Sequence, residues 1–246
     1  MKNLFTKSAM TLAMLGMATA ASAKGYKEVE VSDGGSFVGT VSAGAAEAET
    51  RSYTISKDPE ICGEGSREVP FVQINDTGML MNAVVFLTDV DEGKAFNKDE
   101  INLTLTQEKC EFAPALGVMA NKGELTAINS DHTLHNIHTY EQIGKARRTV
   151  MNVSQPNAGD EVTKVVKLRR GNGMKVECDA HDFMHSFVYV AKNPYYSVVN
   201  ADGGFSIDGI PAGTYEVVMW HGFLGEVEVG EVTISAGGEA TMELTY

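Results

Sequence analysis

Residues 173–187 read GMKVECDAHDFMHSF, and this stretch sets both the fold and the site that we expect. From Met174 to Cys178, apolar residues alternate with charged ones, which is the period-two pattern of a strand with one buried face. His181 then follows Cys178 by three residues, and Met184 follows His181 by three more. Three side chains able to bind a metal therefore lie at the end of a predicted strand and in the loop that follows it.

The same alternation recurs along the chain. In ATMELTY, residues 240–246, Met242 and Leu244 alternate with polar side chains, and no long segment has the 3.6-residue period of a helix. We therefore predict an all-β protein built of β-sandwiches. Turn signals separate the predicted strands at 75–78 (NDTG), 172–173 (NG), 202–204 (DGG), 211–213 (PAG) and 237–238 (GG).

The first 23 residues have the layout of a secretory signal peptide. Lys2 and Lys7 precede an apolar run, and the small residues Ala-Ser-Ala end at Ala23. The alternative is a membrane anchor, but the apolar run is too short to span a bilayer comfortably and no second one follows. We expect cleavage after Ala23, a periplasmic mature protein and no membrane insertion after cleavage.

The chain is acidic. Its 246 residues have a formal charge of −13, which becomes −15 once Lys2 and Lys7 are removed. Such a surface repels phosphate backbones, so nucleic acid and anionic membranes are poor partners. It would suit a basic protein partner, and it would equally serve solubility.

The cysteine count is odd for an exported protein. Two cysteines are expected to pair in an oxidising compartment, which leaves one of the three unpaired. Cys62 and Cys110 lie in polar, loop-like surroundings, whereas Cys178 ends a predicted strand. We assign a Cys62–Cys110 disulfide and a free Cys178, although spacing alone leaves the other pairings open.

A fourth metal-binding side chain comes from an earlier strand. The segment ELTAINSDHTLHNIHTY, residues 124–140, runs from a predicted strand through a polar loop to His135. A thiolate and two imidazoles suit copper in either oxidation state, and a thioether adds a weak axial ligand. Taken alone, the Cys-x-x-His-x-x-Met string also fits two core residues beside a surface histidine. Structural zinc is disfavoured because such sites usually have two or more cysteines.

Residues 105–192 resemble a cupredoxin, the family of plastocyanin and amicyanin. CDAHDFM has the short spacing of amicyanin, and NSDHTLHN resembles the family's first-histidine segment. Carried over by position, the resemblance implies one mononuclear type 1 copper site and a hydrogen bond from Asn136 toward the cysteine loop, which helps to orient the ligands. The implied copper ligands are His135, Cys178, His181 and Met184.

The mature chain also resembles periplasmic methylamine-utilisation or plastocyanin-like proteins, which join a cupredoxin to a carboxypeptidase regulatory-like, transthyretin-like sandwich. In that group, histidine follows a Cys-x-F-x-P segment, whereas this chain has Ala115 there, which puts any second site in doubt. The expected division is a signal peptide (1–23), an N-terminal β segment that forms part of the regulatory-like sandwich (24–104), a cupredoxin domain (105–192) and a regulatory-like domain (193–246). An inserted cupredoxin is favoured over two sandwiches in tandem.

The expected function is single-electron transfer between redox partners, such as a cytochrome or a dehydrogenase, and not enzymatic catalysis. His181 is expected to be the ligand nearest the surface, with Phe183 and His185 at a docking or electron-uptake patch. The alternatives are a copper carrier or sensor, a small copper enzyme and a structural surface domain. On a strand, the odd offset from His135 directs His138 to the opposite face. Roles for His132, His138 and His185 stay open.

Overall fold

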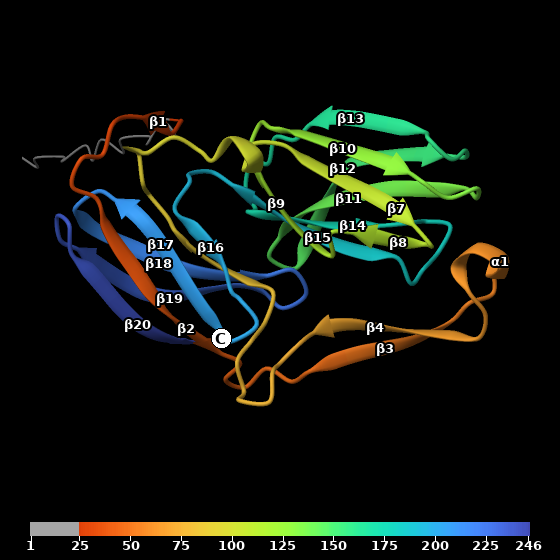
Figure 1. Ribbon diagram of the computed structural model, residues 1–246, viewed down its shortest axis with the longest axis horizontal. Coiled ribbons are helices and arrows are strands. Elements are labelled where there is room, and N and C mark those ends of the chain that lie inside the picture. The colour runs from red at the N-terminus through yellow and green to blue at the C-terminus, as the bar shows by residue number, and fades with distance from the viewer. Residues whose placement is uncertain (1–24) are drawn as a thin grey trace, which may run out of the picture.

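The computed structural model describes residues 25–246, and most of its regular structure is strand (Figure 1). The predicted signal peptide, residues 1–23, lies outside the described residues. Within the described part, the helices are short: α1 (Pro59–Cys62) and the 3-10 helix η1 (Lys98–Glu100). The prediction of an all-β fold is confirmed. No helix between residues 25 and 246 is both long enough and apolar enough to cross a bilayer.

Residues 103–191 form one sandwich of two sheets, which we call the inserted sandwich. Apolar side chains from both sheets, among them Leu105, Ile137 and Val188, meet in one buried cluster. The first sheet has the order β12 (Ala146–Gln155), β11 (His135–Ile143), β14 (Gly173–Glu177), β15 (His185–Ala191) and β9 (Leu116–Ala120). The second has the order β13 (Glu161–Val165), β10 (Glu124–Asn129), β7 (Leu103–Glu108) and β8 (Glu111–Ala113).

The residues on either side of this segment form a second sandwich, the outer sandwich. Phe37, Val85 and Met219 pack together in its core. One sheet has the order β16 (Tyr196–Val198), β5 (Ala83–Leu87), β18 (Gly213–His221) and β19 (Gly225–Ile234). The other has the order β17 (Gly204–Ile210), β2 (Gly35–Ser42) and β20 (Glu239–Thr245). Both sheets therefore pair strands from before residue 90 with strands from after residue 195.

A third cluster joins the two sandwiches. Phe86 and Trp220 of the outer sandwich pack against Tyr189 of the inserted one. The backbone of Gly173 passes so near the indole that an added Cβ would lie 2.3 Å from a carbon of the Trp220 ring. Gly173 is therefore required by close packing at the start of β14, in addition to the turn signal that it gives with Asn172.

A two-stranded arm, residues 49–72, leaves the outer sandwich and runs along the inserted one (Figure 1). It consists of β3 (Glu49–Thr54), helix α1 and β4 (Ser66–Val72), and β3 and β4 pair only with each other. Pro59 lies in the first turn of α1, and Gly63, at φ 94°, ends it. A further short pair joins β1 (Lys27–Glu28) to β6 (Glu92–Gly93).

Candidate metal centre

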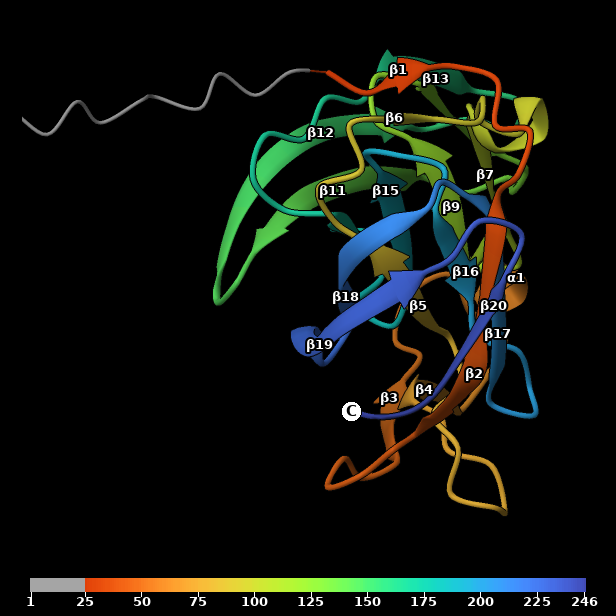
Figure 2. The same cartoon turned by 90° about the vertical axis from the view of Figure 1, so that its left-hand side faces the viewer.

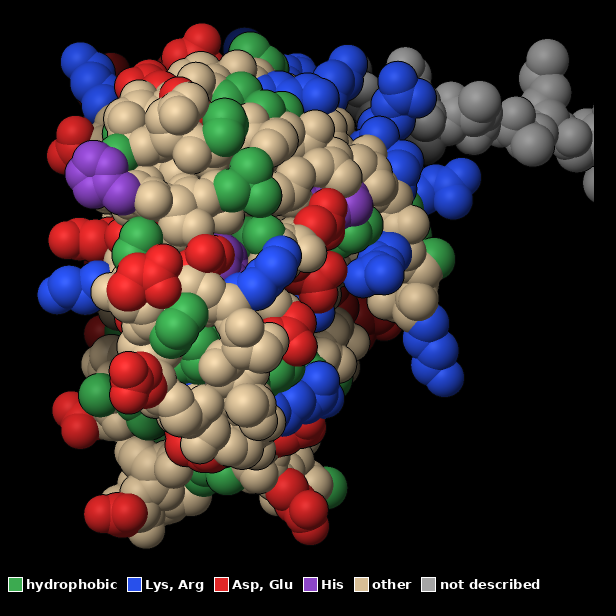
Figure 3. Space-filling model, turned by 90° about the vertical axis from the view of Figure 1, so that its right-hand side faces the viewer, with side chains coloured by type: hydrophobic (Ala, Val, Ile, Leu, Met, Phe, Trp, Pro, Cys, Tyr) green, Lys and Arg blue, Asp and Glu red, His purple; other side chains and the backbone are tan. Residues whose placement is uncertain are grey.

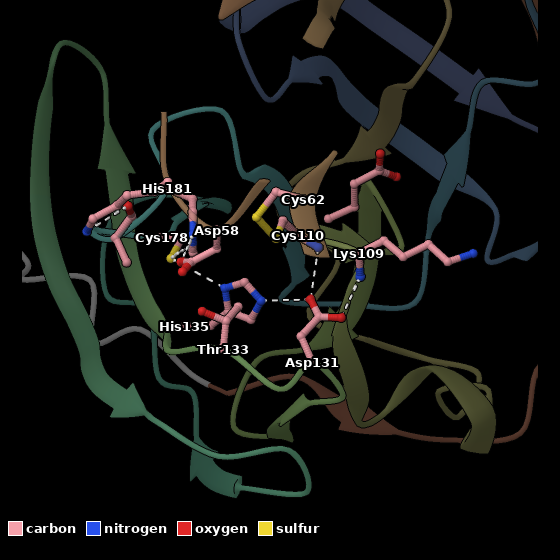
Figure 4. The surroundings of a disulfide bond; sticks show 12 residues. Asp58, Cys62, Lys109, Cys110, Asp131, Thr133, His135, Cys178 and His181 are labelled. Atoms are coloured by element: carbon pink, nitrogen blue, oxygen red, sulfur yellow. Dashed lines mark hydrogen bonds and ion pairs between the residues drawn. A yellow bond between two sulfur atoms is a disulfide. The ribbon is translucent and has the colours of Figure 1, made fainter. Parts of the chain in front are cut away.

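Three of the predicted ligands converge at one end of the inserted sandwich (Figure 4). The Sγ of Cys178 lies 3.9 Å from Nδ1 of His135 and 3.7 Å from Nδ1 of His181. The two imidazole centroids are 5.0 Å apart. All three residues are buried, with at most 4% exposed. A histidine 43 residues before the cysteine is therefore almost as close to its sulfur as the histidine three residues after it.

Strand pairing explains this convergence. His135 is the first residue of β11, and Cys178 directly follows β14. These strands are antiparallel, so the start of one lies beside the end of the other. The loop from β14 to β15 then turns back, where the Met184 N–H donates to the His181 carbonyl at 3.1 Å. Met184 is 1% exposed and packs in the same buried cluster as Cys178.

Asn136 contacts the cysteine loop twice. Its backbone N–H donates to the Sγ of Cys178 at 3.4 Å, and its side-chain oxygen accepts from the N–H of Asp179 at 3.4 Å. Its amide nitrogen donates to Asn152 at 2.7 Å. The residue predicted to bridge from the first histidine to the cysteine loop is therefore positioned to orient the sulfur.

A buried carboxylate holds the outer nitrogen of His135. Asp131 is 6% exposed, and its Oδ2 lies 2.8 Å from Nε2 of His135. The same carboxylate accepts the backbone N–H groups of Lys109 and Cys110. Burial raises the pKa of Asp131, but the Cys110 N–H, His135 and the Lys109 N–H outweigh burial and keep that pKa low. Asp131 therefore fixes the imidazole so that Nδ1 faces the sulfur.

A second carboxylate does the same for His181. Oδ2 of Asp58 lies 2.9 Å from Nε2 of His181, although the two are 123 residues apart in sequence (Figure 4). Burial raises the pKa of Asp58, but hydrogen bonds from Thr133 and His181 outweigh burial and lower it. Asp58 has φ 47°, in the left-handed region, at the start of α1. The tip of the arm therefore supplies a contact to a predicted ligand.

The arm is fastened to the inserted sandwich beside this contact. A disulfide joins Cys62, in α1, to Cys110, between β7 and β8, as predicted. Its sulfurs lie within 4.8 Å of a His181 ring nitrogen. The Arg67 guanidinium donates to the carbonyls of Cys62 and Cys110 and stacks over Phe183, 4.9 Å from the ring centroid. These contacts hold Asp58 against the histidine.

Burial shifts the pKa of two of these side chains, Cys178 and His181, in favour of their neutral forms. Burial raises the pKa of the Cys178 thiol, although the N–H groups of Asn136, Ala180 and His181 act against it. Burial also lowers the pKa of His181, which the hydrogen bond to Asp58 opposes. A neutral imidazole offers a lone pair on Nδ1. A cation at the centre of the three donors would stabilise the thiolate that burial otherwise disfavours.

The spacing also fits a metal. A trigonal ion at about 2.3 Å from sulfur and about 2.0 Å from nitrogen would separate these atoms by about 3.7 Å. The two sulfur–nitrogen distances, 3.9 and 3.7 Å, agree with that separation. The residues present therefore fit a metal held by one thiolate and two imidazoles, and Met184 is buried in the same apolar cluster as Cys178.

The structure differs from the expectation that His181 lies nearest the surface. Its side chain is fully buried, because the arm covers the edge of the ring that carries Nε2. Phe183 is also buried, under Arg67. His185 packs between Tyr53 and Phe71 of the arm, and burial lowers its pKa to about 4. A docking patch at Phe183 and His185 does not fit this geometry.

The remaining histidines lie apart from the three donors. His138 points to the outer face of β11, as its odd offset from His135 predicts, and pairs with Asp179 at 3.0 Å. His132 is exposed. His221, at the end of β18, is buried and accepts backbone N–H groups of the following turn.

Sequence reasoning missed both carboxylates. Asp131 carries a local signal, since it lies four residues before His135 in the same polar loop. Asp58 has no local signal, because it lies on a different segment of the chain. The expected disulfide was the available clue, since linking Cys62 to Cys110 places the residues just before Cys62 beside the inserted sandwich.

Comparison with known proteins gives partial matches. Residues 177–242 match the family described as polysaccharide lyase family 4, domain II, rather than the regulatory-like family that we expected. No curated protein matches the chain. The three solved structures described next match parts of this chain, each with low sequence identity and a low TM-score.

Three solved structures illustrate this. A copper-containing nitrite reductase from Thermus scotoductus has 13% identity and a TM-score of 0.30 over 40% of this chain and 24% of that one. A purple cupredoxin from Nitrosopumilus maritimus has 18% identity and a TM-score of 0.31, covering 36% and 98%. Amicyanin from Paracoccus versutus has 14% identity and a TM-score of 0.30, covering 44% and 97%. This chain therefore spans about a quarter of the nitrite reductase. At such values, the site must be argued from its own side chains.

Proposed function

We propose that this protein is a type 1 copper protein that carries single electrons between redox partners. The observation that supports the proposal most directly is the convergence of His135, Cys178 and His181. Both Nδ1 atoms face one sulfur, at 3.9 and 3.7 Å. Nε2 of each histidine is already hydrogen-bonded to a carboxylate, so Nδ1 is the nitrogen left for a metal.

Copper is the metal that these donors favour. One thiolate and two imidazoles form a trigonal set, and a thioether is a weak, soft ligand that copper accepts. Structural zinc sites usually take four strong ligands with two or more cysteines. Cys178 is the single free cysteine among the described residues, since Cys62 and Cys110 are bonded to each other.

The surroundings of the site favour electron transfer over catalysis. The donors come from β11 and from the loop after β14, and the buried core surrounds them. Asp131, Asp58 and Asn136 each hold one donor in place. Copper would supply a one-electron couple here, and these contacts keep its donors from rearranging as its charge changes. Electron transfer benefits from such rigidity.

The sequence expectation of export places this function in the periplasm, where partners such as a cytochrome or a dehydrogenase could exchange the electron. The Cys62–Cys110 disulfide is consistent with an oxidising compartment. We therefore propose a periplasmic location and a redox protein as the partner.

A second candidate is a copper carrier or sensor without redox turnover. The observation that favours it is the covered edge of His181, which is 1% exposed beneath Asp58. Such a cover slows the approach of any partner to that ligand, and it would also retain copper.

Voltammetry of the copper-loaded protein separates the two. A reversible one-electron couple, with one copper bound per chain, is the result that we expect for an electron carrier. Tight copper binding without a reversible couple would favour the carrier or sensor. The His132→Gln variant is the control, because His132 is exposed and bonds to none of the donors. Failure to bind copper at all would reject both candidates.

A further inference from the structure

The direct route to the metal centre is closed at His181. The arm places Asp58 on its Nε2, and Lys57 reaches the carbonyl of Ala180 at 3.4 Å. The disulfide and Arg67 fasten this cover to the inserted sandwich. A partner that exchanges electrons must therefore approach at another face, unless the cover opens.

One segment of the chain has a charge opposite to the rest. Residues 145–175 contain eight lysines and arginines but two acidic residues, a formal charge of +6, whereas the whole chain has −13. The basic residues are Lys145, Arg147, Arg148, Lys164, Lys167, Arg169, Arg170 and Lys175. Figure 3 shows lysine and arginine side chains gathered along one edge of the molecule.

Three of these basic residues, Lys145, Arg147 and Arg148, lie on the β11–β12 hairpin. Figure 2 shows this hairpin projecting from the body of the protein. The buried carboxylate of Glu141 binds the Arg148 guanidinium at 2.6 Å and accepts the N–H groups of Arg169 and Arg170. On the outer face, the Arg147 guanidinium stacks over Tyr140, 4.4 Å from its centroid. Glu141 thus pairs with one guanidinium, that of Arg148, and with the backbone of Arg169 and Arg170, while the guanidinium of Arg147 stacks on the neighbouring Tyr140.

A series of contacts connects this face to Cys178. The Tyr140 ring stacks on the His138 imidazole, with centroids 4.0 Å apart. Nδ1 of His138 lies 3.0 Å from Oδ1 of Asp179, the residue bonded to Cys178 along the chain. Arg147 also reaches Glu177, on the other side of the cysteine, at 3.5 Å. The His138–Tyr140 pair is thus connected to the two chain neighbours of Cys178, to Asp179 directly and to Glu177 through Arg147.

We propose that the outer face of the β11–β12 hairpin, centred on His138, Tyr140 and Arg147, is the docking surface for an acidic one-electron redox protein. This inference rests on the proposed function. Copper held by His135, Cys178 and His181 would supply one electron in the exchange, the partner would be reduced by that electron, and no bond would form or break. Glu177 and Asp179 lie against this face, where Arg147 and Lys175 contact Glu177 and His138 contacts Asp179. The hairpin itself, residues 135–155, has three basic side chains, Lys145, Arg147 and Arg148, against one acidic side chain, the buried Glu141. Although the net charge of the chain suits a basic partner, this local positive excess favours an acidic one.

The first test needs no copper. Hexacyanochromate(III) is a paramagnetic, redox-inert trianion that broadens the NMR signals of residues near its binding site. Titrated into the metal-free protein, it should broaden signals of residues 138–148 first, and Arg147→Glu should weaken that effect at least fivefold. Lys98→Glu is the matched control, since Lys98 is exposed on η1, away from the hairpin (Figure 2). Broadening centred on α1 and His181 instead would overturn the proposal.

The second test uses the copper-loaded protein and two probes of opposite charge. At low ionic strength, Arg147→Glu should slow oxidation by hexacyanoferrate(III) at least about fivefold and should not slow oxidation by tris(phenanthroline)cobalt(III), a cation. Arg147→Lys should restore the anion rate. Equal rates for wild type and Arg147→Glu with the anion would reject the docking surface. A protein that binds no copper would fail the proposed function while leaving the NMR result unchanged, so the two failures are distinguishable.

Discussion

Asp58 Oδ2 lies 2.9 Å from Nε2 of His181. This contact joins the tip of the arm to the loop between β14 and β15, although the two residues are 123 positions apart in sequence. His135 has the same arrangement with Asp131, at 2.8 Å. Both histidines therefore keep Nδ1 free for a metal and carry a carboxylate on the opposite nitrogen. This symmetry makes the arm a part of the candidate metal centre as well as a cover for it.

Replacing Asp58 should change the reduction potential of the copper. Asp58→Asn removes a negative charge beside His181 and so favours Cu(I) over Cu(II), which raises the potential. The amide keeps a hydrogen-bonding oxygen, so copper should still bind. Voltammetry measures the shift, and Asp91→Asn, which alters an exposed carboxylate away from the site, should show none. A potential unchanged in Asp58→Asn would show that the contact does not reach the metal.

Removing the disulfide should loosen the arm and destabilise the protein. The loop-closure entropy for a separation of 48 residues corresponds to about 4 kcal/mol at 25 °C. We expect the Cys62→Ala, Cys110→Ala double variant to lose up to that amount of unfolding free energy, measured by denaturant titration. The electron-paramagnetic-resonance spectrum of bound copper should also change as Asp58 leaves His181. An unaltered spectrum would mean that Arg67 and the strand packing hold the arm by themselves.

Glu141 should make stability fall in acid. Burial raises its pKa, but hydrogen bonds from the Arg170 N–H, the Arg148 side chain and the Arg169 N–H outweigh burial and lower it to about 2. Because the folded pKa lies below the unfolded value of 4.5, the stabilisation is complete above that value and is lost as the pH falls toward 2. The loss amounts to about 3 kcal/mol.

The Glu141→Gln variant tests this by denaturant titration at several pH values. It should be less stable than wild type near pH 7, and its unfolding free energy should fall less between pH 5 and 2. Glu161→Gln, at an exposed position on β13, should keep the wild-type pH dependence. Parallel pH profiles for wild type and Glu141→Gln would contradict the assignment.

Local pattern was enough to predict the strands and to single out the residues of the candidate metal centre. The alternation from Met174 to Cys178 corresponds to β14, and the Cys-x-x-His-x-x-Met spacing places two donors and a buried thioether in one loop. The disulfide followed from the cysteine count and the surroundings of each cysteine. Each of these signals lies within a few residues of the feature that it predicts.

Long-range placement could not be predicted in this way. Nothing near Asp58 indicates that it contacts His181, because the contact depends on the path of the whole arm. The expectation that His181 is the ligand nearest the surface failed for the same reason, since the arm covers its ring. The charge of the β11–β12 hairpin was also hidden by the net charge, since an average over the chain conceals a segment of opposite sign.

The most direct test of a thiolate-bound copper is the visible absorption spectrum of the copper(II)-loaded protein beside that of Cys178→Ser. The wild type should show an intense visible band from charge transfer between the Cys178 thiolate and copper, and His132→Gln should keep it. The band should be absent in Cys178→Ser, since a hydroxyl cannot replace the thiolate. A colourless wild type, or a Cys178→Ser variant with the same spectrum, would contradict the account.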